Sequence, residues 1–337
     1  MQYRPLGKSP LKVSALCLGT MMFGDQTPLA EATEIVAHAQ DQGVNFLDTA
    51  DVYTRGASEE MLGTILAARR HDWIVATKLG NQMADAPNHG RYSRRWVLAA
   101  AEASLRRLAT DHIDIYYLHR DFEGMDLEEP LRALDQLLRD GKIRYWGLSN
   151  FRGWRIAEAV HLAARLNMPG PAVVQPYYNL LNRMPEVEIL PACRHHGLGV
   201  VPYSPAARGI LSGKYLPGQA PAPDSRVGRG DPRVLQTEFR EESLRIAQEL
   251  QGHARAQGLT LAQFATRWVL GSGVVSSVIA GPRTLAQWLD YLPAQEGAMT
   301  AEDEALIDRL VPPGHPSTPG YTDPNYPALG RHARAIG

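Results

Sequence analysis

Short apolar runs recur along the chain, and most are separated by segments with helical spacing of apolar residues. Each run is too short for a helix, and most contain the β-branched residues that are typical of buried strands. Neighbouring runs mostly lie about 30 residues apart, the length of one βα unit. The pattern predicts alternating strands and helices with a parallel sheet. The strands are expected at residues 15–18, 44–47, 73–77, 113–118, 143–148, 172–174, 199–202 and 275–280.

Capping residues mark the start of two of the helices. Thr27 followed by Pro28 predicts a helix that is capped by Thr27 and ends at Gly43. Thr260 and Gln263 have the spacing of a capping box and predict another helix start. Apolar spacing and terminal glycines predict further helices at residues 94–108, 131–140 and 185–196.

Three segments fall outside the alternation. Residues 1–14 contain a Gly-Lys-Ser-Pro turn between two extended stretches, which predicts an N-terminal β-hairpin. Residues 204–235 follow the seventh strand and are rich in Pro, Gly and Arg, which predicts a long lid loop. Residues 312–337 are expected to form an irregular tail that wraps the surface. With these additions, residues 1–337 are predicted to form a single domain.

Polar residues directly follow several of the apolar runs. Asp48, Lys78 and His119 come after the second, third and fourth runs, and Tyr53 lies in the loop after the second. A doubly wound sheet concentrates its site at one switch point, whereas a barrel gathers residues from many strand ends at one mouth. The distribution therefore favours a (β/α)8 TIM barrel. We expect Asp48 and Lys78 to pair, because an unpaired buried charge is costly.

Composition excludes several classes of protein. The chain is 44% hydrophobic with a net charge of −1, which is typical of a globular protein and provides no basic field for nucleic acid. No apolar stretch reaches the roughly 18 to 20 residues that span a bilayer, and the N-terminus does not resemble a signal peptide. Two cysteines are too few for a disulfide framework. A cytoplasmic location is therefore expected.

Four other site motifs are incomplete. Residues 197–199 contain two glycines of a Rossmann fingerprint, but they precede a strand and lack the third. Residues 209–214 are one residue short of a phosphate-binding P-loop, and residues 147–151 lack the closing glycine of a nucleophile elbow. His195 and His196 have no second ligand pair at a suitable spacing, so no metal site is expected.

The segment from Asp48 to Tyr53 resembles the signature segment of the aldo-keto reductases. The resemblance extends over almost the whole chain in family order, and it favours the branch of bacterial enzymes related to potassium-channel beta subunits. It rests on Asp48–Tyr53, Ser58-Glu59, Leu62-Gly63, 76–78, 104–108, 111–119, 141–144, 147–150, Gln175, 203–205 and 209–215. It implies a (β/α)8 barrel, a nicotinamide cofactor bound in extended form and interconversion of carbonyls and alcohols.

The resemblance also implies a catalytic tetrad of Asp48, Tyr53, Lys78 and His119. A carbonyl that accepts hydride becomes an alkoxide that needs a proton, and a phenol can donate one if its pKa falls from about 10 toward neutrality. Lys78 is expected to lower the pKa of Tyr53, and Asp48 to hold Lys78 charged and aligned. His119 is expected to orient the substrate oxygen by a hydrogen bond.

The cofactor residues that the resemblance implies come from many strand ends, from the lid and from the last helical region. Tyr203 is expected to stack on nicotinamide, and Arg283 to contact a 2′-phosphate, so NADP(H) is expected rather than NAD(H). Tyr291 replaces an Asn that is usual in the family, and Ala206 replaces a Leu. The full set is Thr20, Met21, Ser149, Asn150, Gln175, Tyr203, Ser204, Pro205, Ala206, Ala207, Arg208, Leu211, Lys214, Arg226, Gly281, Arg283, Gln287, Asp290 and Tyr291.

Loop residues are expected to line the substrate pocket, and their mixture of types suits either a sugar or a bulky ketone. They are Met22, Phe23, Arg55, Asp121 and Phe122. Two other functions remain open. One is a lyase in which Lys78 forms a Schiff base with a carbonyl substrate. The other is a cofactor-bound regulatory subunit with little activity.

Overall fold

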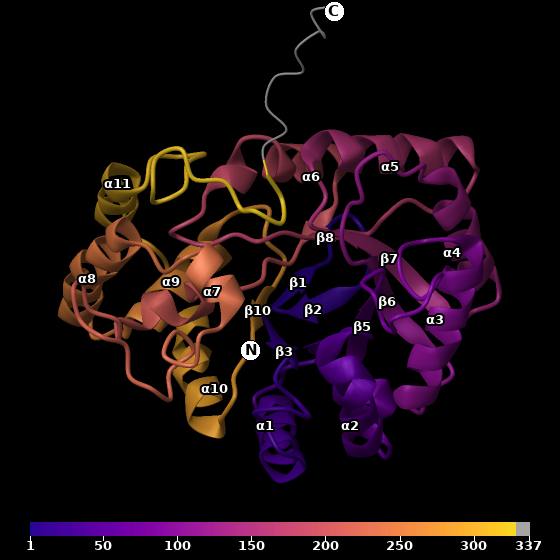
Figure 1. Ribbon diagram of the computed structural model, residues 1–337, viewed down its shortest axis with the longest axis horizontal. Coiled ribbons are helices and arrows are strands. Elements are labelled where there is room, and N and C mark those ends of the chain that lie inside the picture. Colours follow the sequence, from indigo (N-terminus) through magenta and orange to yellow (C-terminus); the bar gives the residue numbers. More distant parts are fainter. Residues whose placement is uncertain (328–337) are drawn as a thin grey trace, which may run out of the picture.

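Residues 1–327 are described by a computed structural model of the chain, and residues 328–337 of the predicted tail lie outside the described residues. Eight parallel strands form one sheet in the order β10-β3-β4-β5-β6-β7-β8-β9 (Figure 1). Parallel bridges Val200–Val275 and Tyr203–Ile279 join its two edges. The strands are β3 Leu16–Gly19, β4 Phe46–Asp48, β5 Ile74–Leu79, β6 Ile113–Leu118, β7 Ile143–Ser149, β8 Val173–Gln175, β9 Gly199–Val200 and β10 Val278–Ala280.

Every predicted apolar run overlaps one of these strands, and the predicted (β/α)8 barrel is confirmed. Helices flank the sheet on its outer side (Figure 1). They are α1 Leu29–Asp41, α2 Ala57–Leu66, α3 Arg94–Arg107, α4 Glu128–Arg139, α5 Gly153–Arg165, α6 Ile189–His196, α7 Pro232–Gln236, α8 Glu241–Ala256, α9 Leu261–Gly271, α10 Leu285–Tyr291 and α11 Ala301–Leu310.

The two capping predictions have different outcomes. Thr260 and Gln263 form the predicted capping box at the start of α9. The predicted cap of α1 is wrong, because Pro28 is its N-cap and no side chain caps it. The Thr27 hydroxyl instead donates to the carbonyl oxygen of Arg283 at 2.9 Å. Thr27 therefore ties the loop after β3 to the loop after β10.

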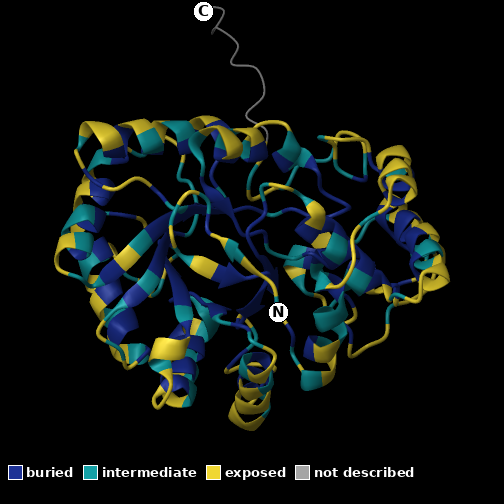
Figure 2. Cartoon of the chain, turned by 180° about the vertical axis from the view of Figure 1, so that it is seen from behind, coloured by how far each residue is buried: buried dark blue, intermediate teal, exposed yellow. Residues whose placement is uncertain are grey.

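Apolar side chains form two layers around the sheet. The outer layer fills the space between the strands and the helices, and its alanine, leucine and valine side chains are buried. The inner layer fills the barrel itself with side chains such as Phe46, Ile115 and Tyr117. Figure 2 shows the strands buried and the outward faces of the helices exposed. The barrel interior is therefore a packed core that supports the polar residues at its mouth.

The predicted hairpin is present and closes the N-terminal end of the barrel. Strands β1 Tyr3–Pro5 and β2 Lys12–Ser14 pair antiparallel. Leu6 and Val13 are fully buried and join the inner apolar layer. At Gly7 a Cβ would lie 2.3 Å from the backbone nitrogen of Gly199, so a side chain does not fit where the turn meets β9.

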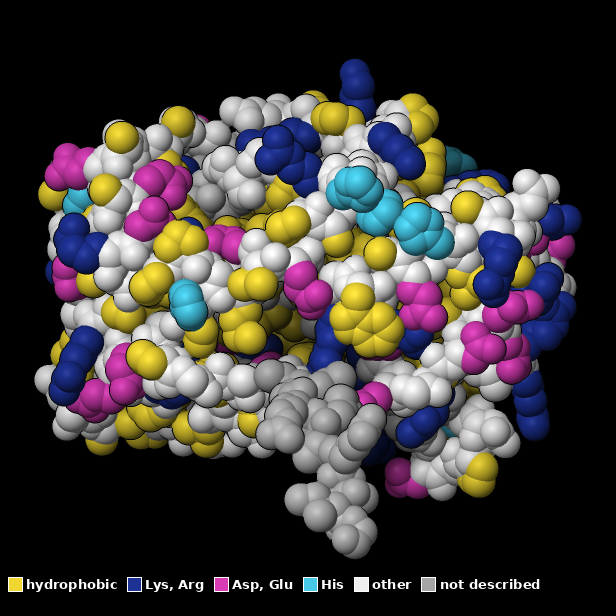
Figure 3. All heavy atoms as spheres, turned by 90° about the horizontal axis from the view of Figure 1, so that it is seen from above, with side chains coloured by type: hydrophobic (Ala, Val, Ile, Leu, Met, Phe, Trp, Pro, Cys, Tyr) yellow, Lys and Arg dark blue, Asp and Glu magenta, His cyan; other side chains and the backbone are white. Residues whose placement is uncertain are grey.

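The lid and the tail lie over the opposite end of the barrel. Residues 204–235 contain a short 3-10 helix, Ala207–Ser212, and the beginning of α7. Residues 312–327 form neither helix nor strand, as predicted, and an isolated bridge joins Asn182 to Pro316. Acidic and basic side chains are interspersed over the face shown in Figure 3. Within residues 1–327, no helix combines the length and apolar character needed to span a membrane.

A buried carboxylate ties α11 to α8. Asp303 completes a capping box with Thr300, and its side chain also accepts hydrogen bonds from His253 at 2.6 Å and Gln257 at 2.5 Å. Burial alone raises the pKa of Asp303, but the hydrogen bonds from Thr300, His253 and Gln257 lower it to about 2. The ionised form is therefore favoured in the folded state.

We predict that Asp303→Asn lowers the free energy of unfolding at pH 7 by about 1–2 kcal/mol. Because the folded-state pKa lies below its ordinary value of 3.8, this stabilisation is present above pH 4 and lost as the pH falls toward 2. Urea unfolding from pH 7 to pH 3 measures the difference. Glu302→Gln, on an exposed position of the same first turn, is the matched control. A difference that stays constant with pH would contradict the assignment.

Candidate active site

The centre of the barrel mouth is a buried ion pair. Asp48 ends β4, and Lys78 lies one residue before the end of β5, so the parallel strands place both side chains at the same end of the barrel. The Lys78 ammonium donates to Asp48 at 2.5 Å, to the Thr49 carbonyl at 2.7 Å and to Tyr53 Oη at 3.2 Å. Gln175 donates to the second oxygen of Asp48 at 2.7 Å. The expected pairing of Asp48 with Lys78 is therefore present.

Tyr53 presents its hydroxyl to the cavity from the short 3-10 helix that follows β4. Thr54 and Arg55 next to it have positive φ of 48° and 54°, so the chain turns sharply at this point. Lys78 Nζ lies 4.8 Å from the centre of the Tyr53 ring. Because Lys78 already donates to the phenol oxygen, that oxygen acts as acceptor toward Lys78. Among residues 1–327, no acceptor takes the proton of the Tyr53 hydroxyl.

His119 follows β6 and lies at right angles to Tyr53, with ring centres 6.0 Å apart. Burial, Lys78 and Arg120 hold the pKa of His119 well below its usual range, so the ring is neutral. The side-chain amide nitrogen of Asn81 lies 3.1 Å from His119 Nδ1. An amide nitrogen is only a donor, so Nδ1 accepts and Nε2 carries the proton. His119 is therefore a neutral hydrogen-bond donor at the cavity.

The pKa values at the site reflect burial and the ion pair. Burial alone lowers the pKa of Lys78, but Asp48 and Tyr53 outweigh it and raise the pKa, which keeps the ammonium charged. Burial raises the pKa of the Tyr53 phenol, and Lys78 opposes that rise. Lys78 thus lowers the pKa of Tyr53, as predicted, but the rise that burial causes is larger. The phenol is therefore protonated at neutral pH.

A cavity of about 360 Å³ opens above these residues. Asp48, Tyr53 and His119 line it, whereas Lys78 lies beneath it and is completely buried. All the predicted cofactor residues line this cavity except Ala207 and Leu211, which belong to the lid and have side chains buried in the core. The structure thus gathers residues from seven strand ends, the lid and α10 around one space.

The cavity lining is strongly basic. Its basic residues are Arg208, Lys214, Arg226, Arg229, Arg233 and Arg283, and its carboxylates are Asp48 and Asp290. Within residues 1–327, Lys214, Arg229 and Arg283 form no ion pair. Gln26 accepts hydrogen bonds from Arg229 at 2.9 Å and from Arg283 at 3.2 Å. Such a lining is suited to a polyanion.

Several of the predicted cofactor residues are linked to one another by hydrogen bonds. Tyr203 donates from its hydroxyl to Asn150 at 2.7 Å. Asn150 donates to the His119 carbonyl at 2.9 Å and to Ser149 at 3.0 Å. Asp290, another predicted cofactor residue, accepts from Thr260 and Gln263 at 3.0 Å each. These bonds hold the cavity wall in place.

The predicted substrate residues are dispersed. Met22 lines the cavity, and Asp121 and Phe122 line a neighbouring groove. Arg55 is exposed and lines neither space. The structure corrects the placement of Phe23, because its side chain is fully buried in the core between the barrel and the helices.

Sequence reasoning missed several lining residues, most of them in the lid and the tail, with Gln26 in the loop after β3 and Ala262 in α9. They are Gln26, Gly209, Ser212, Arg229, Arg233, Ala262, Asn325 and Tyr326. The density of arginine in residues 204–235 was the available signal for Arg229 and Arg233. The approach of Asn325 and Tyr326 depends on long-range contacts and leaves no local signal.

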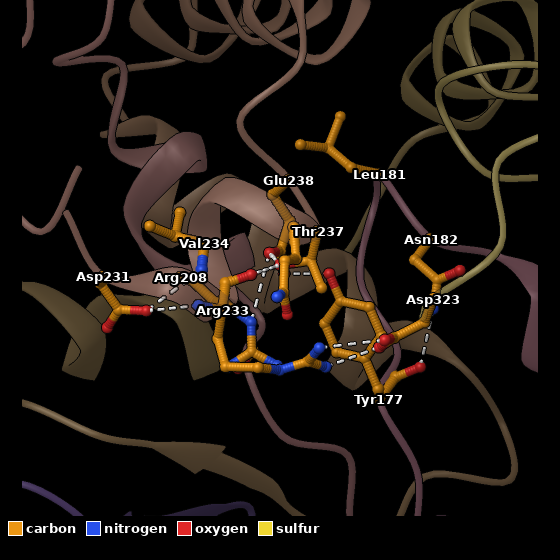
Figure 4. Close-up of polar contacts among 12 residues, drawn as sticks. Tyr177, Leu181, Asn182, Arg208, Asp231, Arg233, Val234, Thr237, Glu238 and Asp323 are labelled. Carbon is orange, nitrogen blue, oxygen red and sulfur yellow. Dashed lines mark hydrogen bonds and ion pairs between the residues drawn. The ribbon is translucent and has the colours of Figure 1, made fainter. Parts of the chain in front are cut away.

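A clasp of ion pairs joins the lid to the tail. Arg233, in α7, binds Asp323 of the tail through two bonds of 3.0 and 2.7 Å (Figure 4). Beside it, Arg208 lies 3.2 Å from Glu238, whose side chain also accepts from Tyr177 and Thr237. Asp323 in turn accepts from the backbone nitrogen of Asn325 at 2.9 Å. The clasp therefore fixes the turn that brings Tyr326 to the cavity.

Comparison with known proteins matches the chain to one family model and to relatives along most of its length. The model of the Aldo/keto reductase family matches residues 15–312. A probable voltage-gated potassium channel subunit beta from Arabidopsis thaliana is 39% identical over 300 residues, which are 87% of this chain and 91% of that protein. An uncharacterized oxidoreductase from Bacillus subtilis, YrpG, is 34% identical over 95% of this chain and 99% of its own length. L-glyceraldehyde 3-phosphate reductase from Escherichia coli O157:H7 is 34% identical over 93% of each chain.

A second buried carboxylate, that of Asp51, lies near the predicted tetrad. Among residues 1–327, neither carboxylate oxygen of Asp51 has a hydrogen-bond partner, whereas neighbouring Glu59 binds Arg107 at 2.7 Å and Thr77 at 2.5 Å. Burial and the charge of Glu59 raise the pKa of Asp51 from an ordinary value of 3.8 to about 8. The folded state therefore favours protonated Asp51 at neutral pH.

We predict that Asp51→Asn stabilises the protein increasingly as the pH rises. A raised folded-state pKa means that stability is lost as the pH increases from about 4 through 8, and Asn removes this loss. The expected gain in free energy of unfolding is a few kcal/mol, about 2–4, at pH 8.5 and smaller at pH 5.5. Urea unfolding at both pH values measures it, with exposed Asp25→Asn as the control. Equal gains at the two pH values would refute the protonated state.

Proposed function

The chain belongs to the aldo/keto reductase family, and on that premise we propose that it is an NADP(H)-dependent oxidoreductase that reduces an aldehyde or ketone to an alcohol, reversibly. The observation that carries the proposal is the bond from Lys78 to the Tyr53 oxygen at the floor of a basic cavity. Free, buried Cys17 and Cys193 support the accompanying proposal of a reducing, cytoplasmic setting.

The residues present fit an extended dinucleotide. Lys214, Arg229 and Arg283 line the cavity and have no carboxylate partner within residues 1–327, so phosphate groups would neutralise them. Gly209 has a positive φ of 98°, and a Cβ there would lie 3.7 Å from Lys214 Nζ, so the backbone lies open to a ligand. We assign the pyrophosphate to the lid, the nicotinamide to Tyr203 and Asn150, and a 2′-phosphate to Arg283.

Tyr53 is the proposed proton donor. When bound, the nicotinamide would supply a hydride to the carbonyl carbon of the substrate. The Tyr53 hydroxyl faces the cavity with its proton free of any acceptor among residues 1–327, so it can donate to the carbonyl oxygen. Lys78 stabilises the phenolate that remains, because its ammonium donates to that oxygen. Asp48 keeps Lys78 charged and aligned.

His119 is proposed to orient the substrate. Its neutral ring holds a proton on Nε2 because Asn81 occupies Nδ1. A donor at this position can hydrogen-bond the carbonyl oxygen beside Tyr53 and polarise it as negative charge develops there. We assign proton transfer to Tyr53 and not to His119, because the N–H of a neutral imidazole is a much weaker acid than an imidazolium.

The two other functions are supported less well. A Schiff-base lyase needs an accessible, unprotonated lysine, whereas Lys78 is fully buried, charged and bound by three acceptors. Similarity to a potassium channel subunit beta favours a cofactor-bound regulatory role as the second candidate. Slow turnover, tight cofactor retention and a stable partner would distinguish that role from carbonyl reduction.

We predict that Tyr53→Phe lowers kcat for carbonyl reduction by about 10³-fold, in the range of a lost general acid. Binding of NADPH is expected to stay within about twofold of the wild type, because the phenyl ring preserves the cavity wall. Oxidation of NADPH on addition of a carbonyl panel and fluorescence titration of NADPH measure the two effects. Exposed Tyr3→Phe is the matched control. Turnover of Tyr53→Phe at the wild-type rate would exclude Tyr53 as the proton donor.

We predict that Arg283→Gln weakens NADPH binding by about tenfold or more, as expected for a lost charged contact to phosphate. NADH binding is expected to change by less than about threefold, because NADH has no 2′-phosphate. Parallel titrations of the two cofactors provide the test. Arg309→Gln, an exposed charge on α11, controls for net charge. If both cofactors lose affinity equally, Arg283 does not read the 2′-phosphate.

A further inference from the structure

A groove of about 850 Å³ lies beside the proposed cofactor cavity. Residues after β6, β7 and β8 form its walls together with residues 321–327 of the tail. It shares Asn150, Asn325 and Tyr326 with the cavity, so the two spaces adjoin at the mouth of the barrel. If the chain reduces carbonyls as proposed above, the groove is suited to the part of the substrate that does not react.

Arg120 occupies the junction between the groove and the cavity. It directly follows His119 and lines the groove. Its guanidinium carbon lies 5.3 Å from the centre of the Phe122 ring and 5.4 Å from that of Tyr326, which itself lines both spaces. Two aromatic rings thus hold the guanidinium in place.

The backbone of Arg120 bonds with the Tyr92 hydroxyl, whereas its guanidinium makes no hydrogen bond or ion pair within residues 1–327. The structure records no ion pair to its guanidinium there, and its Nε is buried without a hydrogen-bond partner. Nearby carboxylates are engaged elsewhere, Asp121 with Arg155 at 3.1 Å and Asp323 with Arg233 at 2.7 Å. A guanidinium presents five donors and does not lose its charge, so a buried Nε without a partner indicates a place for an acceptor.

Carboxylates at the rim of the groove do not cancel this charge. They are Glu123, Asp126, Glu158 and Glu188, and all four side chains belong to exposed residues. Exposed charges act through water at high dielectric constant and are screened by salt. Arg120 is half-buried, so its field at the junction is screened less. An anion near His119 would therefore meet a favourable charge once it has passed the rim.

The tail keeps this arrangement in place. The backbone nitrogen of Tyr326 donates to the Asp323 carbonyl at 2.9 Å, and Asp323 is held by Arg233 of the lid (Figure 4). Arg152, which also lines the groove, donates to the Pro327 carbonyl at 2.6 Å. The ring of Tyr326 is thus positioned against Arg120 by contacts that do not involve the Arg120 side chain.

We propose that Arg120 binds an anionic group of the substrate, so that the preferred substrates are aldehydes or ketones that carry a phosphate or a carboxylate. The guanidinium would pair with that group at the junction while the carbonyl lies between Tyr53 and His119. Arg120 is in this account a specificity-determining residue and takes no part in proton transfer.

The test uses the full chain with saturating NADPH and matched pairs of substrates. The carboxylate pair is 4-carboxybenzaldehyde and 4-carbamoylbenzaldehyde, and the phosphate pair is glyceraldehyde 3-phosphate and glyceraldehyde. We expect kcat/KM to favour the anionic member of at least one pair by about tenfold or more, and Arg120→Met to reduce that ratio to about one. Reduction of the neutral member by Arg120→Met is expected to stay within about threefold of the wild type. The pair with the larger ratio identifies phosphate or carboxylate as the preferred group.

Two controls separate binding from structure and from net charge. Arg91→Met removes an arginine that packs against the same Phe122 ring but lines neither space, and it is expected to keep the preference. Arg120→Lys is expected to keep the preference in part, because the charge remains while the planar fork is lost. If Arg120→Met lowers kcat/KM equally for the anionic and the neutral member of a pair, Arg120 has a structural role and the proposal is overturned. Equal kcat/KM for the two members of both pairs in the wild type would also overturn it. If no carbonyl is reduced by folded protein that binds NADPH, the proposed function itself fails.

Discussion

The ammonium of Lys78 is the group on which the geometry of the site depends. It is fully buried and donates to three oxygens at once, from Asp48, Thr49 and Tyr53. A buried charge of this kind is tolerated only when it is paired and hydrogen-bonded, so Asp48 and the barrel mouth must be in place for it to exist. In return, the ammonium determines which way the Tyr53 hydroxyl points. The distinctive feature of Tyr53 is therefore its orientation, because Lys78 holds the oxygen and no acceptor among residues 1–327 takes the proton.

The rest of the barrel holds that cluster in place. The inner layer of apolar side chains supports it from below, and the hairpin seals the far end of the barrel with Leu6 and Val13. The lid and the tail cover the mouth, joined by the clasp between Arg233 and Asp323. Positive charge is concentrated in this cover, whereas the chain as a whole has a net charge of −1. A chain with nearly equal numbers of acidic and basic residues can thus contain one strongly basic cavity.

Local sequence patterns were sufficient for the strands and for the strand-end residues. Apolar runs located all eight strands. Asp48, Lys78 and His119 all lie within one or two residues of a strand's carboxyl end, so the barrel brings them together whatever path the loops take. The cap of α1 was mistaken because Thr27 found a more distant partner in the Arg283 carbonyl. Phe23 looked like a pocket residue, but it packs into the core. The contribution of Tyr326 depends on contacts between segments far apart in the chain, which no local pattern records. Likewise, only the three-dimensional structure shows that no acceptor within residues 1–327 takes the Tyr53 proton.

We propose that Asp48, Lys78 and Tyr53 act as one unit that orients the hydroxyl of Tyr53. A double-mutant cycle on kcat tests it most directly, with Asp48→Asn, Tyr53→Phe and the combined variant compared for reduction of the same aldehyde. If Asp48 acts only through Lys78 on the phenol, Asp48→Asn slows the wild type but leaves the rate of Tyr53→Phe unchanged within about threefold. If Asp48→Asn slows both backgrounds by the same factor, the two residues act independently and the account is contradicted.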